Sequence, residues 1–420
     1  MVSDGEGPAA VAAGPSAADP AGTPADVLRK VYVEPTTACD LACRTCVRHA
    51  WDEPEGFMEW ATYEAVVEGL VELADDSSGE ERPSTSSAAG ARVGPGRPGL
   101  HPMAAPTIAF MGLGEPLLHE RFVDMVRLAK AHGLRTEVTT NALLLDDEMA
   151  GDLASAGLDQ LVVSIDGASA ESFGRVRSGA SLARVIENVQ RLHDWERPNQ
   201  ASPVTIGVEF VALRSTLGEL PHLGRVAAQL GASFVIVSNV LPYTEELAGE
   251  TLYDRGVTAG AAPAASHTPR WHLPRLDFDA ETGAAIGAAL HRAAHVTMVD
   301  VDLDSANARC PFVHADSCAV AWHGGVSPCP PLLHTFPCYV RGRHKLMTRW
   351  EVGRLPDESL GRVWARPDYA AFRDRVRRFD FPPCTDCECE LAEGNLEDCF
   401  GNPHPVCGDC LWARGVIRCA

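Results

Sequence analysis

Three kinds of sequence signal are missing from this chain. No run of 18 or more apolar residues occurs, so nothing predicts a membrane-spanning helix. Residues 1–26 lack both the basic start and the continuous apolar stretch of a signal peptide. An excess of positive charge is also missing, because the formal net charge is −21 at pH 7. We therefore expect a cytoplasmic protein that binds neither membrane nor nucleic acid, which needs a basic protein face.

What the chain does contain is length, apolar residues and cysteine. Its 420 residues are enough for one large barrel with an appended domain, and a hydrophobic fraction of 45% supports a core. Fourteen cysteines without an export signal point to metal binding. Disulfides are the weaker interpretation, because the cytosol keeps thiols reduced.

Apolar runs alternate with amphipathic stretches between residues 27 and 300. Strands are expected at residues 31–34, 107–111, 135–140, 160–165, 204–213 and 234–240. Helices are expected at 60–74, 120–131, 146–156, 182–195, 217–230 and 280–294. This alternation favours a parallel α/β barrel. The tail of residues 1–26 and two insertions, 75–106 and 254–274, are rich in small residues and Pro, so we expect them to be flexible.

The most informative stretch follows the first predicted strand. Cys39, Cys43 and Cys46 are spaced C-x3-C-x2-C, and three thiolates on one tight loop can ligate three irons of a [4Fe–4S] cube. The fourth iron then keeps an open position, as catalytic metal sites do. A zinc site or a disulfide pair is the alternative. Zinc motifs usually contain converging C-x2-C pairs, so we favour the cluster.

This pattern resembles the signature of the radical SAM superfamily. The resemblance implies a partial (β/α)6 TIM-like barrel in which S-adenosylmethionine (SAM) chelates the open iron. It also implies an enzyme that cleaves SAM reductively to a 5′-deoxyadenosyl radical, with the three cysteines as catalytic ligands. A low-potential donor such as ferredoxin or flavodoxin would supply the electron. One position departs from the family pattern, because Thr45 stands where an aromatic residue usually precedes the third cysteine.

A glycine-rich turn, residues 112–116, follows the second predicted strand. Gly112 and Gly114 let the backbone approach a ligand closely, and the Glu115 carboxylate can accept a hydrogen bond from an ammonium group. Taken alone, an ordinary Gly-Pro turn explains these residues. Placed one strand–helix unit after the cysteine loop, they resemble the family motif that binds the SAM amino group.

Further candidates for SAM binding stand at the ends of the next two strands and just beyond them: Asn141, Ser164, Asp166 and Arg177. By the same resemblance, the Ser and Asp lie near the ribose, and the Arg reaches the SAM carboxylate. A guanidinium suits that task because its fork holds a carboxylate bidentately. A helix cap and a surface Arg are the alternative interpretations.

Residues 301–420 form a second, cysteine-rich region. The spacing Cys310-x13-Gly324-x4-Cys329, with a hairpin turn expected at Gly324-Gly325, resembles the opening of a SPASM domain. The resemblance implies one or two auxiliary iron–sulfur clusters. Candidate ligands are Cys310, Cys329, Cys384, Cys387, Cys399, Cys407, Cys410 and Cys419. Zinc stays open as an alternative. Two basic stretches, residues 341–349 and 367–378, are predicted to be a solvated connector.

The resemblance as a whole is to radical SAM/SPASM maturases, which act on peptides or on other proteins. A closer similarity, to maturases of tungsten-dependent oxidoreductases, rests on Glu34-Pro35-Thr36, on residues 43–46 and 51–54, and on the tail 398–412. One alternative is a ribosomal-peptide maturase that forms a thioether or carbon–carbon crosslink. Another is a non-catalytic iron–sulfur or zinc scaffold, although such a carrier needs no SAM site at Glu115.

Overall fold

A computed structural model describes residues 27–78, 105–199, 202–253, 270–273, 280, 282–285, 295–298, 309–382, 384–386 and 389–419. The tail 1–26, most of both predicted insertions, most of the helix expected at 280–294 and the proposed domain boundary at residue 300 lie outside these ranges. No helix in the described ranges is long and apolar enough to cross a membrane.

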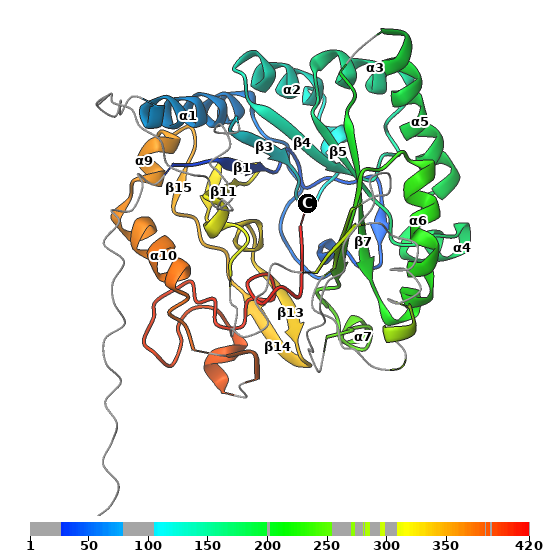
Figure 1. Cartoon of the computed structure of the whole chain (residues 1–420). Helices are drawn as coiled ribbons and strands as arrows, with labels where there is room; N and C mark the ends of the chain where they lie inside the picture. Colours follow the sequence, from blue (N-terminus) through cyan, green and yellow to red (C-terminus); the bar gives the residue numbers. More distant parts are fainter. Residues whose placement is uncertain are drawn as a thin grey trace, which may run out of the picture.

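A curved, mainly parallel sheet organises the molecule (Figure 1). In chain order its barrel strands are β1 (Lys30–Val33), β3 (Thr107–Phe110), β4 (Arg135–Thr140), β5 (Gln160–Ser164), β7 (Thr205–Ala212) and β8 (Phe234–Asn239). Each pairs in parallel with the next. The predicted strands and the fold class are therefore confirmed.

Helices cover the outside of this sheet (Figure 1). They are α1 (Trp60–Ser78), α2 (Phe122–Ala131), α3 (Asp147–Ala156), α5 (Leu182–Asn199) and α6 (Leu220–Gln229). Local sequence signals set their ends. The Asp146 side chain caps α3 by accepting from Met149 N–H, and Gly157 ends that helix in the left-handed conformation. Helix α1 extends to Ser78, four residues into the predicted insertion.

The sheet continues beyond the barrel at both edges. Next to β8 come β9 (Arg270–Leu273) and β10 (His295–Met298). Strand β9 lies inside the segment 254–274, so the prediction that this segment is flexible is wrong at residues 270–273. At the other edge β11 (Ser317–Val320) pairs in parallel with β1. Antiparallel β12 (Gly325–Ser327) and β15 (Gly353–Arg354) follow, so the hairpin expected at Gly324-Gly325 is confirmed.

Smaller elements complete the cysteine-rich region and the site. Two-stranded ladders join β13 (Phe336–Val340) to β14 (Arg343–Met347) and β2 (Ala42–Cys43) to β6 (Arg177–Ser178). Short helices are α4 (Ala170–Val176), α7 (Glu245–Ala248) and α9 (Leu360–Trp364), and the longer α10 (Pro367–Arg378) follows.

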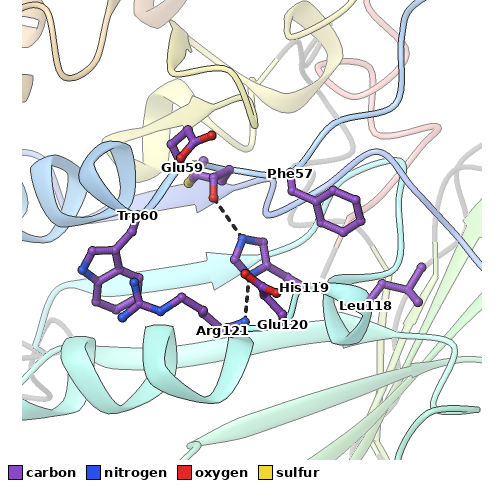
Figure 2. A pocket seen from close by; sticks show the side chains of 8 residues that line it. Phe57, Glu59, Trp60, Leu118, His119, Glu120 and Arg121 are labelled. Carbon is purple, nitrogen blue, oxygen red and sulfur yellow. Dashed lines mark hydrogen bonds between the residues drawn. The ribbon is translucent and has the colours of Figure 1, made fainter.

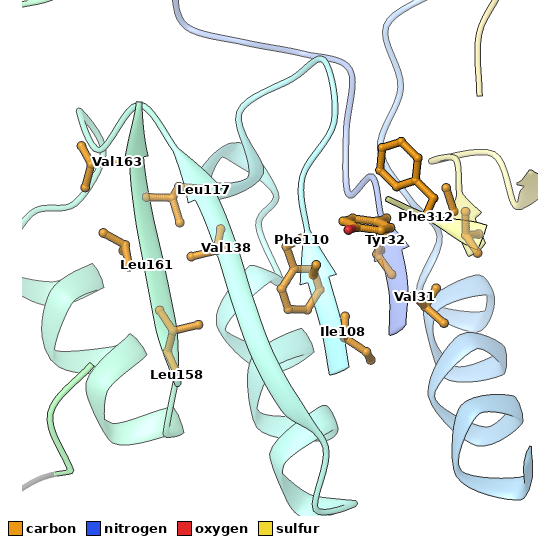
Figure 3. Close-up of a cluster of buried hydrophobic side chains, with 14 of the residues drawn as sticks. Val31, Tyr32, Ile108, Phe110, Leu117, Val138, Leu158, Leu161, Val163 and Phe312 are labelled. Atoms are coloured by element: carbon orange, nitrogen blue, oxygen red, sulfur yellow. The ribbon is translucent and has the colours of Figure 1, made fainter. Parts of the chain in front are cut away.

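The core lies against both faces of the parallel strands (Figure 3). Phe110 is fully buried and meets the Phe122 ring edge to face, with centroids 5.0 Å apart. Tyr32 on β1 meets Phe312 from the cysteine-rich region in the same way, at 5.5 Å. One continuous core therefore spans the barrel and the C-terminal region.

The basic stretches are partly packed, so the prediction of a solvated connector is wrong for Lys345 and Arg373. Lys345 is 2% exposed and lies 2.6 Å from Asp409, which Arg343 also contacts. On α10, Arg373 is 2% exposed, with its guanidinium 3.8 Å from the ring centre of Trp364. A buried cation persists only with such partners, and Asp409 lies far from Lys345 in the sequence.

We expect Phe110→Ala to lower the free energy of unfolding by about 3–5 kcal/mol, because the truncation leaves a cavity in a packed core. The matched control is Phe57→Ala, since Phe57 is 47% exposed and its loss should cost under about 0.5 kcal/mol. Denaturant unfolding of the anaerobically purified proteins measures both. Equal losses for the two variants would contradict the core assignment.

Candidate active site

A cavity of about 220 Å³ lies where the barrel strands end. Its wall contains all but one of the residues predicted for the cluster and for SAM: Cys39, Cys43, Cys46, Gly112, Gly114, Glu115, Asn141, Ser164 and Arg177. In parallel strands the carboxyl ends meet at one edge, which brings these separate loops together. Asp166 is the exception.

The cysteine loop is tied down on two sides. Arg44, between the second and third cysteines, reaches Glu246 and Glu250 at 2.7 and 2.8 Å. On the other side, the Asn141 side-chain amide donates to Asp40 at 2.7 Å. These contacts hold the loop in place without using the thiols, none of which forms a disulfide.

The thiols of this loop are poorly suited to be charged by themselves. Burial raises the pKa of Cys39 to about 12, and it raises the pKa of Cys43 to about 11 although Arg177 opposes the shift. Iron would supply the missing positive charge and lower these pKa values. Among the described residues no three His, Cys, Asp or Glu side chains converge on one metal-ion position. A cube needs no such convergence, because each thiolate binds its own iron.

Glu115 is held in the cavity wall by its neighbours. One oxygen accepts from Thr140 Oγ1 at 2.6 Å and from Leu117 N–H at 3.1 Å. The other, Oε2, accepts from Asn141 N–H at 2.8 Å. Burial raises its pKa to about 7, although these hydrogen bonds oppose the shift. Each carboxylate oxygen has room for about two donors, so Oε2 can take one more.

The glycine turn lies directly against the cysteine loop. Glu115 N–H donates to the Ala38 carbonyl at 2.8 Å. A Cβ atom on Gly114 would come within 2.3 Å of the Thr36 carbonyl oxygen, so only glycine fits there. The absence of a side chain thus sets the spacing between the two loops.

Asp166 lies behind the wall and acts on Arg177. Its Oδ2 atom is 2.9 Å from Arg177 Nε, and its Oδ1 accepts from Val211 N–H at 3.1 Å. Asp166 is 1% exposed. The structure therefore brings Asp166 to the arginine and not to the cavity, whereas Ser164 and Arg177 reach the cavity directly.

Sequence reasoning missed several polar residues of the wall, among them Glu209 and Tyr243. Glu209, on β7, stands opposite Ser164 in the ladder, and no described residue gives its carboxylate a hydrogen bond or ion pair. Burial and then Asp166 raise its pKa to about 7, against the opposing effect of Arg177. A charged residue inside the apolar run of residues 206–211 was the signal available in the sequence.

The C-terminal cysteines form two groups. Burial raises the pKa of Cys329 well above its usual range, and neighbouring Cys310, Cys407 and Cys410 add to the rise. Burial and then Asp409 raise the pKa of Cys384 to about 11, and the thiols of Cys399 and Cys389 add to the rise. The prediction omitted Cys389, and Cys387 lies outside the described residues.

Cys419, another predicted ligand, is set apart from the second group. Its sulfur accepts from Trp412 Nε1 at 3.2 Å, and burial and then Glu209 raise its pKa to about 12. Backbone and side-chain contacts hold this end of the chain at the end of β8, where Asn239 donates to the Val416 carbonyl at 2.8 Å. Figure 1 shows the chain end at the centre of the barrel.

A second pocket, of about 510 Å³, lies between the starts of α1 and α2 (Figure 2). His119 contacts the Met58 carbonyl at 2.9 Å, and the Arg121 guanidinium stacks 3.5 Å from the ring centre of Trp60. The residues lining it include none of those predicted for the site. We therefore place the chemistry at the cysteine-lined cavity.

Known proteins share sequence and fold with this chain. Residues 103–208 match the Radical SAM superfamily model, and residues 310–388 match SPASM, an iron–sulfur cluster-binding domain. The chain is 27% identical, over 93% of its length and 97% of the relative, to the tungsten-containing aldehyde ferredoxin oxidoreductase cofactor-modifying protein of Pyrococcus furiosus.

Among solved structures, the fold resembles Streptococcus suis SuiB bound to precursor peptide SuiA, with a TM-score of 0.54 at 14% identity, covering 83% of this chain and 67% of that one. SuiB bound to S-adenosylmethionine gives 0.53 at 13% identity, covering 89% and 73%. The predicted family resemblance is confirmed.

We expect Glu209→Gln to flatten the pH dependence of stability between pH 6 and 8.5. The Glu209 carboxyl has a pKa of about 7 in the folded protein, above its ordinary value of 4.5, so the folded state binds more protons. Wild type therefore loses stability as pH rises through 7, by about 1 kcal/mol, and the uncharged Gln does not. Thermal melts across this range, with exposed Glu187→Gln as control, measure the effect. Parallel curves for Glu209→Gln and wild type would contradict it.

Proposed function

This chain is a radical SAM enzyme with a SPASM domain, and we propose that it cleaves SAM reductively and uses the radical to mature a protein partner, a tungsten-dependent oxidoreductase. The observation that carries the proposal is the shared cavity. Three free thiols, a glycine turn, a buried carboxyl and an arginine line one space at the ends of the barrel strands.

The residues of the cavity divide the task. Cys39, Cys43 and Cys46 would hold three irons of a [4Fe–4S] cluster. When bound, the cluster supplies the electron and the open iron that SAM cleavage requires. Glu115 has a free acceptor position on Oε2 for the SAM ammonium group. Arg177, held by Asp166 at 2.9 Å, is oriented to meet a carboxylate.

The remaining wall residues would hold the nucleoside and the loop. Ser164 stands at the end of β5, where a ribose hydroxyl can meet it. Asn141 is locked by Asp40 and so links the glycine turn to the cysteine loop. Asp166 contributes through Arg177, as a positioning residue, and not by touching the ribose itself.

The cysteine-rich region would carry the auxiliary clusters. Cys310, Cys329, Cys407 and Cys410 lie near one another, and their number matches the four ligands of a cube. A second cluster would use Cys384 with Cys389 or Cys399 and with Cys387. We include a ferredoxin- or flavodoxin-type electron donor and a cytoplasmic location in the proposal.

The choice of partner rests on how much of the chain each similarity covers. The similarity to the Pyrococcus furiosus cofactor-modifying protein spans 93% of the chain, which favours a tungsten oxidoreductase as the partner. Peptide maturation, with a thioether or carbon–carbon crosslink, is the second candidate, because the fold resembles a structure bound to a precursor peptide. A scaffold without catalysis would not need the free acceptor on Glu115.

We expect dithionite-reduced protein, reconstituted with iron and sulfide, to release 5′-deoxyadenosine from SAM. Cys43→Ala should abolish release, because the first cluster loses a ligand and no electron source remains at the cavity. Cys318→Ala is the matched control, since Cys318 is buried in β11 and does not line the cavity. Chromatographic quantification of the product measures the effect. Equal release from Cys43→Ala and wild type would overturn the proposed function.

We expect Glu115→Gln to weaken SAM binding by about ten- to a hundredfold at pH 8 while the iron content stays unchanged. A charge-assisted hydrogen bond contributes roughly 1.5–3 kcal/mol, and about 1.4 kcal/mol is a factor of ten in affinity. Equilibrium dialysis of SAM against the reconstituted proteins gives the dissociation constants of wild type and of Glu115→Gln. Glu187→Gln is the control. Unchanged affinity in Glu115→Gln would remove Glu115 from the proposal but leave the rest intact.

A further inference from the structure

A histidine of the cysteine-rich region lies buried between two carboxylates of the barrel. His334 is 1% exposed. Its Nε2 is 2.7 Å from a Glu34 oxygen, and its Nδ1 is 2.6 Å from a Glu53 oxygen. Glu34 directly follows the first barrel strand, and Glu53 follows the cysteine loop. One side chain therefore connects three separate segments of the chain.

The contacts indicate that His334 is a cation. A carboxylate only accepts, so both ring nitrogens must donate, and only imidazolium has two N–H groups. The Trp51 ring meets the imidazole edge to face, with centroids 4.6 Å apart. The second oxygen of Glu53 accepts from Thr335 N–H at 3.1 Å, and Arg349 lies 3.9 Å from it.

The second oxygen of Glu34 holds the glycine turn of the cavity. It accepts from Leu113 N–H at 3.1 Å, between the two glycines of that turn. A Cβ atom on Gly112 would come within 2.5 Å of Glu34 Cγ, so the turn rests directly on this side chain. Gly112, Leu113 and Gly114 all line the cavity.

We propose that His334 is a positioning residue for SAM: by fixing Glu34 it sets the backbone of the glycine turn, and it thereby makes SAM affinity depend on the cysteine-rich region. The inference rests on the proposed function, because it assumes that SAM occupies this cavity. His334 follows Cys329 by five residues, so the contact joins the auxiliary-cluster region to the SAM turn.

The physical reason is the cost of an unpaired buried charge. Glu34 is 1% exposed, and without the imidazolium its carboxylate would stand unpaired away from water. It would then take up a proton or turn aside, and either change disturbs the bond to Leu113 N–H. The turn would lose the support that places its backbone, and Glu115 at its end would shift with it.

The test compares SAM binding in full-length, reconstituted variants of matched iron content, by equilibrium dialysis with SAM as the probe. We expect His334→Ala and Glu34→Gln each to weaken SAM binding by about tenfold. The double variant should be no weaker than about the stronger single, because the two residues act in series. His344→Gln, an exposed histidine on β14, should bind as wild type does.

Glu53→Gln separates positioning from plain stabilisation. It removes the other carboxylate of His334 but touches no residue of the glycine turn. We expect it to lower the melting temperature. The dissociation constant for SAM should stay within about threefold of wild type, because Glu34 still accepts from Leu113 N–H. If His334→Ala loses iron, His334→Gln takes its place, since it keeps volume and one donor.

Two failures are distinguishable. Wild type that binds no SAM would overturn the proposed function itself. Wild type that binds SAM, together with His334 and Glu34 variants that melt earlier but bind SAM equally well, would overturn the positioning role. Additive losses in the double variant would also overturn it, since they would mean that the two residues act independently.

Discussion

The pairing of strand β1 on both of its edges is the constraint on which the rest of the structure depends. On one edge it pairs with β3, which leads into the glycine turn, and on the other with β11 of the cysteine-rich region. The cysteine loop leaves the end of the same strand. Backbone hydrogen bonds along one strand therefore set the spacing between the cluster loop, the SAM turn and the C-terminal region.

Buried charge follows from this arrangement. Glu34, Glu115 and Asp166 are each at most 2% exposed, which is tolerated only with donors in place. His334 pairs with Glu34, and three hydrogen-bond donors contact Glu115. Asp166 forms an ion pair with Arg177 and accepts from Val211 N–H. Glu209 has no such partner in the described chain and lines the cavity. The charged groups are thus arranged around one space, which suits a zwitterionic ligand such as SAM.

Local sequence was enough to predict the barrel and most of the candidate site. The strands follow from apolar runs, the cysteine loop follows from its short spacing, and the candidate roles of Glu115 and Arg177 follow from the family resemblance. It was not enough for residues whose role depends on a distant partner. Glu209 was not predicted as a site residue. The basic residues near Lys345 were predicted to be solvated, because their partner Asp409 lies 64 positions later.

The sequence by itself determined the fold class, the cysteine loop, the glycine turn and the cysteine-rich region, because spacing and periodicity are local properties of a chain. Only the tertiary structure decided that Asp166 lies behind Arg177, that Cys389 joins the group of Cys384, and that His334 bridges Glu34 and Glu53. These pairings join residues up to 300 positions apart. Their geometry is set by how strands and loops pack, which no local pattern encodes.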